Sequence, residues 1–283
     1  MKFGVFGMNM HPCITPEAIA RVARAAEDSG FESLWGGEHI VLADPQAPPS
    51  PLPPNTQFVD LCATMAFVAA HTTTLRLVTG IIILPLRNPI VLAKQLASVD
   101  VVSNGRLVFG VGIGNLRVEF AALGMPFDHK GLRAEEALGV MKALWTMEQP
   151  GYKGRFFRLA GVRAEPRPVQ KPHPPIIFGG KTPHAFSRTA RLGSGWFGYG
   201  LSLEATAQCV EGIRRACGAY GRPFDEIEIS VTPKDKLDHD LVRRYGKLGV
   251  RRLVIAPSAL DTDAAVLAVQ AAGRELIDHA AAG

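Results

Sequence analysis

Short apolar segments rich in β-branched residues alternate with longer segments of helical periodicity along the whole sequence. The first pair is a strand expected over residues 2–7 and a helix over 14–30, in which Thr15 suits the N-cap, Pro16 stands at the first helical position and Gly30 ends the helix. The same pattern predicts further strands over 31–40, 75–84, 106–114, 174–180, 195–200, 227–232 and 251–257. It predicts further helices over 57–73, 88–105, 133–146, 182–193, 203–221, 240–249 and 264–277.

This alternation predicts the fold class. Strands separated by helices pair in parallel through right-handed crossovers. Eight strand–helix units in 283 residues favour a closed (β/α)8 TIM barrel over an open doubly wound sheet. We expect one domain over residues 1–283, with an excursion rich in Pro and Arg at about 150–175 between two barrel units. In such barrels the active site lies at the C-terminal ends of the strands, so those ends hold the candidate residues.

Composition narrows the function classes. Hydrophobic residues make up 47% of the chain and charged residues 20%, which is typical of a globular protein with a sizeable core. No cluster of Lys and Arg with interleaved aromatic residues indicates nucleic-acid binding, and no apolar run reaches the roughly 18 residues of a membrane span. The four cysteines are scattered without a C-x-x-C pair, and the N-terminus lacks the long apolar region of a signal peptide. We therefore expect a cytoplasmic protein without a metal site.

The strand ends do not carry the residues of a self-sufficient hydrolase. An H-x-H pair is absent after the first strand, and the chain contains no G-x-S-x-G nucleophile motif. No carboxylate pair or nucleophile with its base stands out. The chemistry is therefore expected to belong to a bound cofactor.

Two glycine-rich strand ends are candidates for binding a phosphate. The run GVGIGN places Gly112 and Gly114 at the end of the fourth strand, but Asn115 stands where a dinucleotide fingerprint needs its third glycine. In IIFGGKTPHAF, Gly179 and Gly180 open a helix N-terminus. Lys181 adds a charge there and Thr182 is a cap residue. The alternative is that Gly-Gly merely forms a tight turn into the helix.

Three segments together carry a family resemblance: GFESLWGGEHIV over 30–41, the stretch from LVTGIIILPL to GMPF over 77–127, and PPIIFGGKTPHAFSRTARLGSGWF over 174–197. They resemble the luciferase-like monooxygenase family, in particular its branch of oxidoreductases that use the deazaflavin coenzyme F420. The resemblance extends over nearly the whole chain. It implies a ring cofactor across the top of the barrel, with its phosphate held by backbone amides from the ends of the fourth and fifth strands.

The resemblance also assigns residues. The implied cofactor-binding positions are Gly112, Gly114, Asn115, Gly179, Gly180, Lys181, Thr182 and Trp196. In the family the third strand carries a bulge with a non-proline cis peptide behind the ring, which falls within Gly80, Ile81 and Ile82. Without the resemblance, these three residues indicate only an ordinary buried strand.

On the substrate side, the resemblance points to His39 as the catalytic residue. In relatives a histidine at this end of strand two stands near the reactive part of the ring and takes part in proton transfer or substrate positioning. The alternative for His39 is a packing or surface role. Met8 and Asn9 are expected to shape the substrate side together with the proline-rich loop 44–58, which is either a lid or a stiff surface loop.

The chain departs from the family at two positions. Some sugar-phosphate dehydrogenases of the family carry a proton-transferring glutamate directly after G-x-G, and many other members carry Trp, where this chain has Asn115. Asn cannot act as an acid or base, so chemistry that depends on that glutamate is in doubt. Ser194 replaces the acid of the usual G-D-G-W before strand six.

These observations give three functional hypotheses. The leading one is hydride transfer between F420 and a small organic substrate. The second is a monooxygenase that receives reduced flavin mononucleotide (FMN) from a partner flavin reductase, and the third is a non-catalytic flavin-binding barrel. The resemblance further implies a homodimer through the helices over 57–71 and 90–102, whose apolar surface would serve equally against the barrel.

Overall fold

The computed structural model describes residues 1–278, in which parallel strands close into a barrel. The hydrogen-bonded order is β3-β2-β1-β11-β10-β9-β8-β5-β4, and an additional pairing of β3 with β5 closes the ring. The barrel strands are β1 (Lys2–Phe6), β2 (Ser33–Gly36), β3 (Arg76–Thr79) with β4 (Ile82–Ile83), β5 (Leu107–Gly112), β8 (Ile176–Gly179), β9 (Gly195–Leu201), β10 (Glu228–Pro233) and β11 (Val250–Ile255). The predicted TIM barrel is therefore confirmed.

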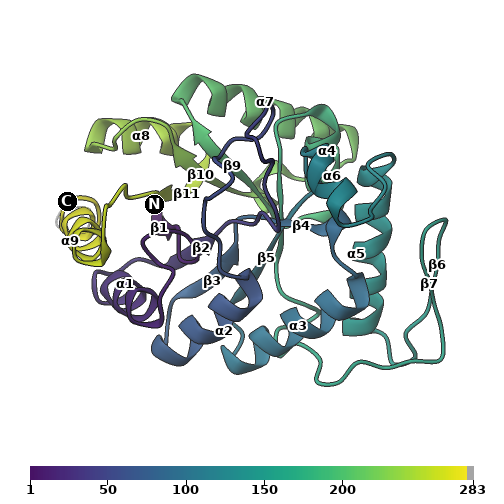
Figure 1. The fold of residues 1–283 in the computed structure, drawn as a ribbon. Coiled ribbons are helices and arrows are strands. Elements are labelled where there is room, and N and C mark those ends of the chain that lie inside the picture. Colours follow the sequence, from purple (N-terminus) through teal and green to yellow (C-terminus); the bar gives the residue numbers. More distant parts are fainter. Residues whose placement is uncertain (279–283) are drawn as a thin grey trace.

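Helices surround the strands on the outside (Figure 1). They are α1 (Pro16–Asp28), α2 (Leu61–His71), α3 (Pro89–Val102), α4 (Arg117–Ala122), α5 (Lys130–Thr146), α6 (Pro183–Leu192), α7 (Leu203–Ala219), α8 (His239–Lys247) and α9 (Thr262–Gly273), followed by the π-helical turn Arg274–Asp278. Short 3-10 turns occupy Leu84–Leu86 and Phe224–Glu226. The Thr15 side chain accepts a hydrogen bond from the Ala18 backbone N–H, as its sequence position predicts.

The third barrel strand is interrupted. β3 ends at Thr79 and β4 begins at Ile82, and the peptide bond between Gly80 and Ile81 is cis. This bond lies within the three residues that the resemblance indicated. β4 then continues the pairing with β5, so the strand re-enters the sheet directly after the interruption.

The barrel interior and the barrel–helix layer hold two separate apolar cores. The interior core consists of Trp35, Val78, Val108, Ile177, Phe197 and Val254. The larger core packs the outward faces of the strands against the helices. Because this packing is close, the side chains at its centre have no contact with solvent. The interior core closes the barrel below the strand ends, so a ligand site has to lie above it.

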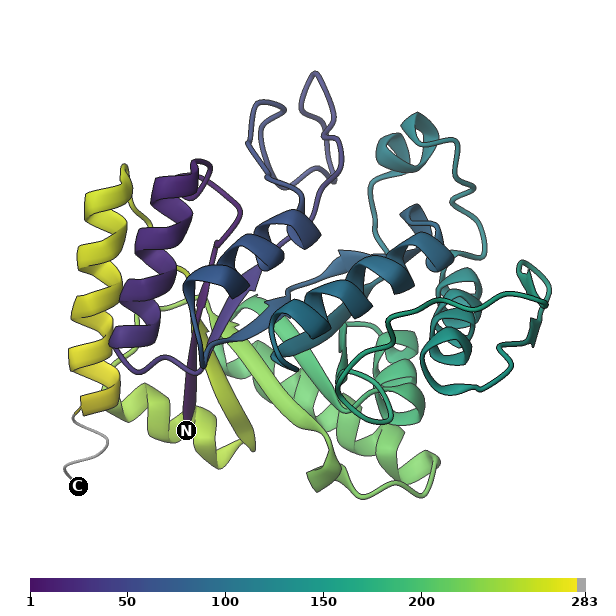
Figure 2. The same cartoon turned by 90° about the horizontal axis from the view of Figure 1, so that it is seen from below.

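Two segments stand outside the strand–helix alternation. The excursion after α5 forms an antiparallel hairpin of β6 (Tyr152–Lys153) and β7 (Arg158–Leu159), which projects from the barrel in Figure 1. Helix α4 was not predicted, because its six residues are too short to show a helical period. Figure 2 shows α4 and the loop between β2 and α2 rising on the same side of the barrel.

No helix within residues 1–278 has the length and apolar character needed to cross a membrane. All four cysteines are buried free thiols.

Candidate functional site

A cavity of about 1160 Å³ lies at the C-terminal ends of the barrel strands. The residues predicted from the sequence that line it are His39, Gly80, Ile81, Gly112, Gly114, Asn115, Gly179, Gly180, Lys181 and Thr182. They come from four successive strand ends, which the parallel barrel brings to one edge. The structure thus gathers most of the sequence-predicted site residues around one cavity.

The floor of the cavity is built around Ile81. A Cβ atom added to Gly112 would lie 2.1 Å from Ile81 Cδ1, and one added to Gly179 would lie 3.2 Å from Ile81 Cγ2. The side chain of Ile81 therefore fills the space that glycine leaves at both neighbouring strand ends. These two glycines have a packing reason for being glycine, whatever ligand their backbone contacts.

The second glycine of the pair at β8 leads directly into helix α6. Gly180 has φ +113°, a backbone conformation that favours glycine, and the Thr182 side chain caps the helix by accepting a hydrogen bond from Ala185 N. Trp196 Nε1 donates a 2.8 Å hydrogen bond to the Gly180 carbonyl. Gly-Gly therefore forms a tight turn into a capped helix, and phosphate binding at this helix end stays a prediction.

The assignment of four predicted side chains to the cavity has to be corrected. Met8, Asn9, Ile82 and Trp196 are each 1% exposed or less and lie outside the cavity lining. Ile82 faces the core because successive strand residues alternate, so Ile81 and Ile83 take the cavity face. Trp196 reaches the site only through its hydrogen bond to Gly180.

Met8 and Asn9 are buried because the chain folds back over the end of β1. The Gly7 and Met8 backbone N–H groups both donate to the Trp35 carbonyl, and Met10 N donates to Gly7 O at 3.2 Å. Asn9 Nδ2 donates to the carbonyls of Gly37 and Val59, each at 2.9 Å, and so ties the two ends of the β2–α2 loop together. Met10, two residues beyond Met8, is the residue that lines the cavity.

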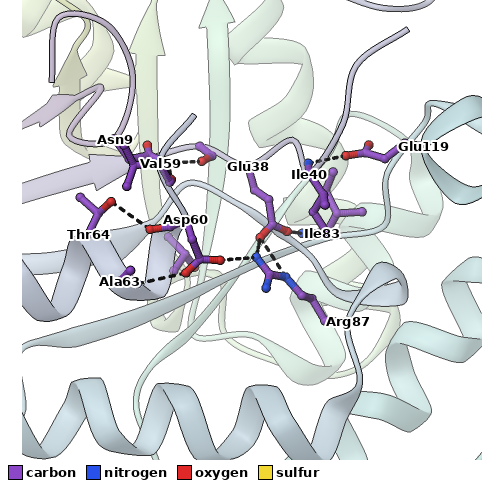
Figure 3. A network of polar contacts seen from close by, with 12 residues as sticks. Asn9, Glu38, Ile40, Val59, Asp60, Ala63, Thr64, Ile83, Arg87 and Glu119 are labelled. Carbon is purple, nitrogen blue, oxygen red and sulfur yellow. Dashed lines mark hydrogen bonds and ion pairs between the residues drawn. The ribbon is translucent and has the colours of Figure 1, made fainter. Parts of the chain in front are cut away.

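A buried carboxylate, Glu38, fastens the third strand to the end of the second (Figure 3). Its Oε2 accepts a 2.7 Å hydrogen bond from Ile83 N, and its Oε1 accepts from the Arg87 guanidinium. Arg87 Nη2 also contacts Asp60 Oδ2 at 3.0 Å, at the start of α2. Burial raises the pKa of Glu38, and the charge of Arg87 lowers it by less. The sequence gives no local signal for these partners of Glu38.

His39 lies beside a second buried carboxylate. Its Nδ1 is 3.4 Å from Glu119 Oε2, while Glu119 Oε1 accepts a 2.7 Å hydrogen bond from Ile40 N. The Glu119 side chain is fully buried and the His39 side chain is 15% exposed. The Phe58 ring packs edge-on against the imidazole, with centroids 5.7 Å apart. Sequence reasoning missed Glu119, although a single acid inside the apolar segment 118–123 is a usable signal.

Four Arg and Lys side chains also line the cavity. We define the cationic side of the cavity as Arg117, Lys130, Lys181 and Arg188. Lys130 Nζ donates to Gly114 O at 2.7 Å and lies 3.7 Å from the centroid of the Phe127 ring. Burial lowers the pKa of Lys130, and the charge of Arg117 lowers it further. Lys181 is exposed and has no ion-pair partner within the described part of the chain.

Two carboxylates also stand on this edge of the cavity, Asp128 and Glu135. Glu135 is bound to Arg191 at 2.8 Å and lies 3.7 Å from Arg188, so part of its charge is already compensated. The cavity therefore combines an apolar floor, a histidine flanked by buried acids, and a cationic side. This arrangement suits a flat molecule that carries an anionic group at one end.

Comparisons with known proteins agree with this architecture. Residues 1–234 match the family described as luciferase-like monooxygenase. The chain is 30% identical over 277 residues to an uncharacterized protein of Mycobacterium tuberculosis, and this match covers 94% of this chain and 95% of the relative. It is also 30% identical over 204 residues to the FMNH2-dependent dimethylsulfone monooxygenase of Pseudomonas putida, covering 71% of this chain and 53% of the relative.

Among solved structures, the coenzyme F420-dependent tetrahydromethanopterin reductase of Methanopyrus kandleri superposes with a TM-score of 0.79. The two chains share 18% sequence identity, and the match covers 98% of this chain and 99% of the reductase. At this identity the likeness shows the fold alone.

Proposed function

The chain belongs to the luciferase-like monooxygenase family, and from that membership we propose that it is an oxidoreductase that binds coenzyme F420 in this cavity and transfers a hydride to or from a small organic substrate. The observation that supports this proposal is the cationic side of the cavity. Beyond its ring, F420 carries a phosphodiester and several carboxylates, whereas FMN ends at a single phosphate. Basic side chains from α4, α5, α6 and the segment before α6 suit the longer anionic tail.

The described residues fit a bound deazaflavin at both ends. Ile81 and the backbone of Gly80 offer an apolar floor for the ring, and the cationic side offers charge-assisted hydrogen bonds to the tail. When bound, F420 supplies the hydride chemistry. The chain itself orients the ring, restricts water and presents the His39 imidazole as a group that can hold or deliver a proton.

The cavity also has room for a substrate. Ligand pockets usually measure about 300–1,000 Å³, and this one measures about 1160 Å³. Its remaining lining includes Met10, Leu52, Phe58 and Tyr199, which are apolar or aromatic. We propose that these side chains, in place of Met8 and Asn9, form the substrate side and favour an organic molecule with apolar surface.

A second candidate function is a monooxygenase that uses reduced FMN. The identity to the dimethylsulfone monooxygenase supports it, since that relative is FMNH2-dependent by name. This reaction would require a flavin reductase as a partner and oxygen as co-substrate. Both candidates place a flavin-type cofactor in the same cavity.

Equilibrium titration of the purified protein separates these proposals. F420 and FMN are each added in oxidised and reduced form, and binding is followed by fluorescence and calorimetry at several salt concentrations. The F420 proposal predicts that F420 binds more tightly than FMN and that its affinity falls more steeply with salt, because more charges are involved. Preference for reduced FMN would favour the monooxygenase. Binding of neither cofactor would contradict the assignment of this cavity to a flavin-type cofactor.

A further inference from the structure

Glu119 is a fully buried carboxylate whose two oxygens have different partners, the Ile40 backbone and the His39 ring. We propose that Glu119 is a positioning residue: it holds the neutral imidazole of His39 in the tautomer protonated on Nδ1 and leaves Nε2 as the proton acceptor on the cavity. This inference rests on the proposed role of His39 in the reaction. The family resemblance does not imply this role for Glu119. The glutamate that some members carry lies directly after G-x-G, where this chain has Asn115.

The backbone contact fixes how the Glu119 carboxylate is oriented. A backbone N–H can only donate, so Glu119 Oε1, at 2.7 Å from Ile40 N, must be an acceptor. That bond sets the plane of the carboxylate and directs Oε2 toward His39 Nδ1. Ile40 directly follows His39, so the same carboxylate holds both the ring and the backbone that carries it.

Because the Glu119 side chain is buried, its Oε2 needs the contact with His39 Nδ1 as well. Within residues 1–278, the only hydrogen-bond partners of Glu119 side-chain oxygens are Ile40 N and His39 Nδ1. A buried polar oxygen without a donor costs about 1–3 kcal/mol. The arrangement that gives Oε2 a donor is an imidazole with its proton on Nδ1, and a neutral ring then has its lone pair on Nε2.

The other neighbours of His39 do not compete for Nδ1. Glu38 is adjacent in sequence, but its oxygens are taken by Ile83 N and Arg87. Phe58 contacts the ring edge-on and restricts its rotation without offering a hydrogen bond. Among the described residues, none bonds His39 Nε2, and His39 lines the cavity. Nε2 is therefore the ring atom left for a ligand.

Nitrogen NMR of the full chain with ¹⁵N-labelled histidine tests the proposal directly. The His39 signals are identified by their absence from the His39→Gln variant. In the wild-type protein we expect the neutral His39 ring to show the protonated-nitrogen signal at Nδ1 and the unprotonated one at Nε2. The opposite assignment in the wild type would overturn the proposal.

The Glu119→Gln variant sharpens the test. The Gln oxygen is expected to take the Ile40 N–H, which turns the amide NH2 group toward Nδ1 and forces Nδ1 to accept. We therefore expect the His39 tautomer to reverse, with the proton on Nε2. Glu135→Gln is the matched control, because Glu135 lines the same cavity but binds Arg191 and Arg188, and it should leave the His39 tautomer unchanged.

Retention of the Nδ1 proton in folded Glu119→Gln would mean that the carboxylate does not select the tautomer. If this variant fails to fold, the wild-type assignment alone decides the question. The measurement needs neither cofactor nor substrate. If the protein binds no flavin-type cofactor, the proposed function is contradicted and the tautomer result still stands. If the tautomer is the opposite one, this inference is contradicted and the cofactor-binding result still stands.

Discussion

Two networks in which one arginine holds two carboxylates lie at opposite ends of the barrel. At the N-terminal ends of the strands, Arg252 of β11 binds Glu32 with two hydrogen bonds of 2.9 Å and also binds Glu228, which in turn contacts Lys2. At the C-terminal ends, Arg87 binds Glu38 and Asp60 (Figure 3). The two networks look alike, but their carboxylates are in different electrostatic states.

Burial alone would raise the pKa of Glu228, and the charges of Arg252 and Lys2 outweigh burial and lower it. Glu38 has a single arginine and a side chain only 4% exposed, so burial prevails and its pKa is raised. The network at the N-terminal ends of the strands therefore stabilises the fold. The network at the C-terminal ends keeps a buried carboxylate whose charged form is disfavoured, and this carboxylate holds the backbone of Ile83 beside the cavity floor. This difference matches the general division of barrels into a stabilising and a functional end.

The largest expected effect is that of Arg252→Met. It leaves Glu32 and Glu228 without their shared cation next to the barrel interior, and removing one partner of such a pair typically costs about 3 kcal/mol. We expect the free energy of unfolding in urea to fall by about that amount, with cofactor affinity unchanged in the folded variant. Weaker cofactor binding with normal stability would show that the lower end is not a separate stabilising region.

Arg87→Met should destabilise less, by about 2 kcal/mol at neutral pH, because Arg87 is partly exposed and Asp60 can turn to solvent. The variant should also lose cofactor affinity, since Glu38 would no longer be held against the third strand. Its deficit in unfolding free energy should shrink as the pH falls, because Glu38 then becomes protonated and needs no counter-charge. Arg243→Met, which removes an exposed pair with Asp240, is the control and should change stability little.

The two glutamates should also differ in how their replacement by Gln depends on pH. The pKa of Glu228 is below the ordinary value of 4.5, so the stability it contributes is complete above that pH and is lost as the pH falls through its folded pKa. The pKa of Glu38 is above 4.5, so its contribution is complete below that pH and is lost as the pH rises through its folded pKa.

Urea unfolding of Glu228→Gln and Glu38→Gln across this range measures both effects. Relative to wild type, Glu228→Gln should become less stable as the pH rises from about 3 to 5. Glu38→Gln should become more stable relative to wild type as the pH rises from about 4 upward. Slopes of the same sign for both variants would contradict the distinction between the two networks.

The fold was predictable because its signal is local. The hydrophobic periodicity of each strand and helix is visible in consecutive residues, and the parallel barrel follows from the alternation of strands and helices. The residues at the strand ends were therefore found as well. The error at Met8 and Asn9 has a physical reason: the chain doubles back after Gly7, which has φ +109°, and buries the two residues that simple extension of β1 would have placed on the cavity.

The partners within the site were not predictable in this way. His39 and Glu119 are 80 positions apart, and Glu38 and Arg87 are 49 apart, so neither pairing leaves a local pattern. Each depends on how two loops meet above the barrel, and loop conformations vary more than the elements that they connect. The positions of the strand-end residues were predictable from the sequence, and the network that orients them was not.

The smallest expected effects come from two exposed lysines at opposite ends of the barrel, Lys2 and Lys181. Lys2→Gln removes a 2.7 Å surface contact with Glu228 and should lower the free energy of unfolding by less than about 1 kcal/mol, without changing cofactor affinity. Lys181→Gln removes a lining cation that has no ion-pair partner among the described residues, so stability should stay the same. Its loss should instead weaken binding of F420 about two- to fivefold, or of FMN if that is the cofactor that binds. Calorimetry at low and high salt provides the check, because an electrostatic contribution of this kind should disappear as salt is added. An equal loss of affinity in Lys2→Gln would mean that overall charge, and not the cationic side of the cavity, attracts the cofactor.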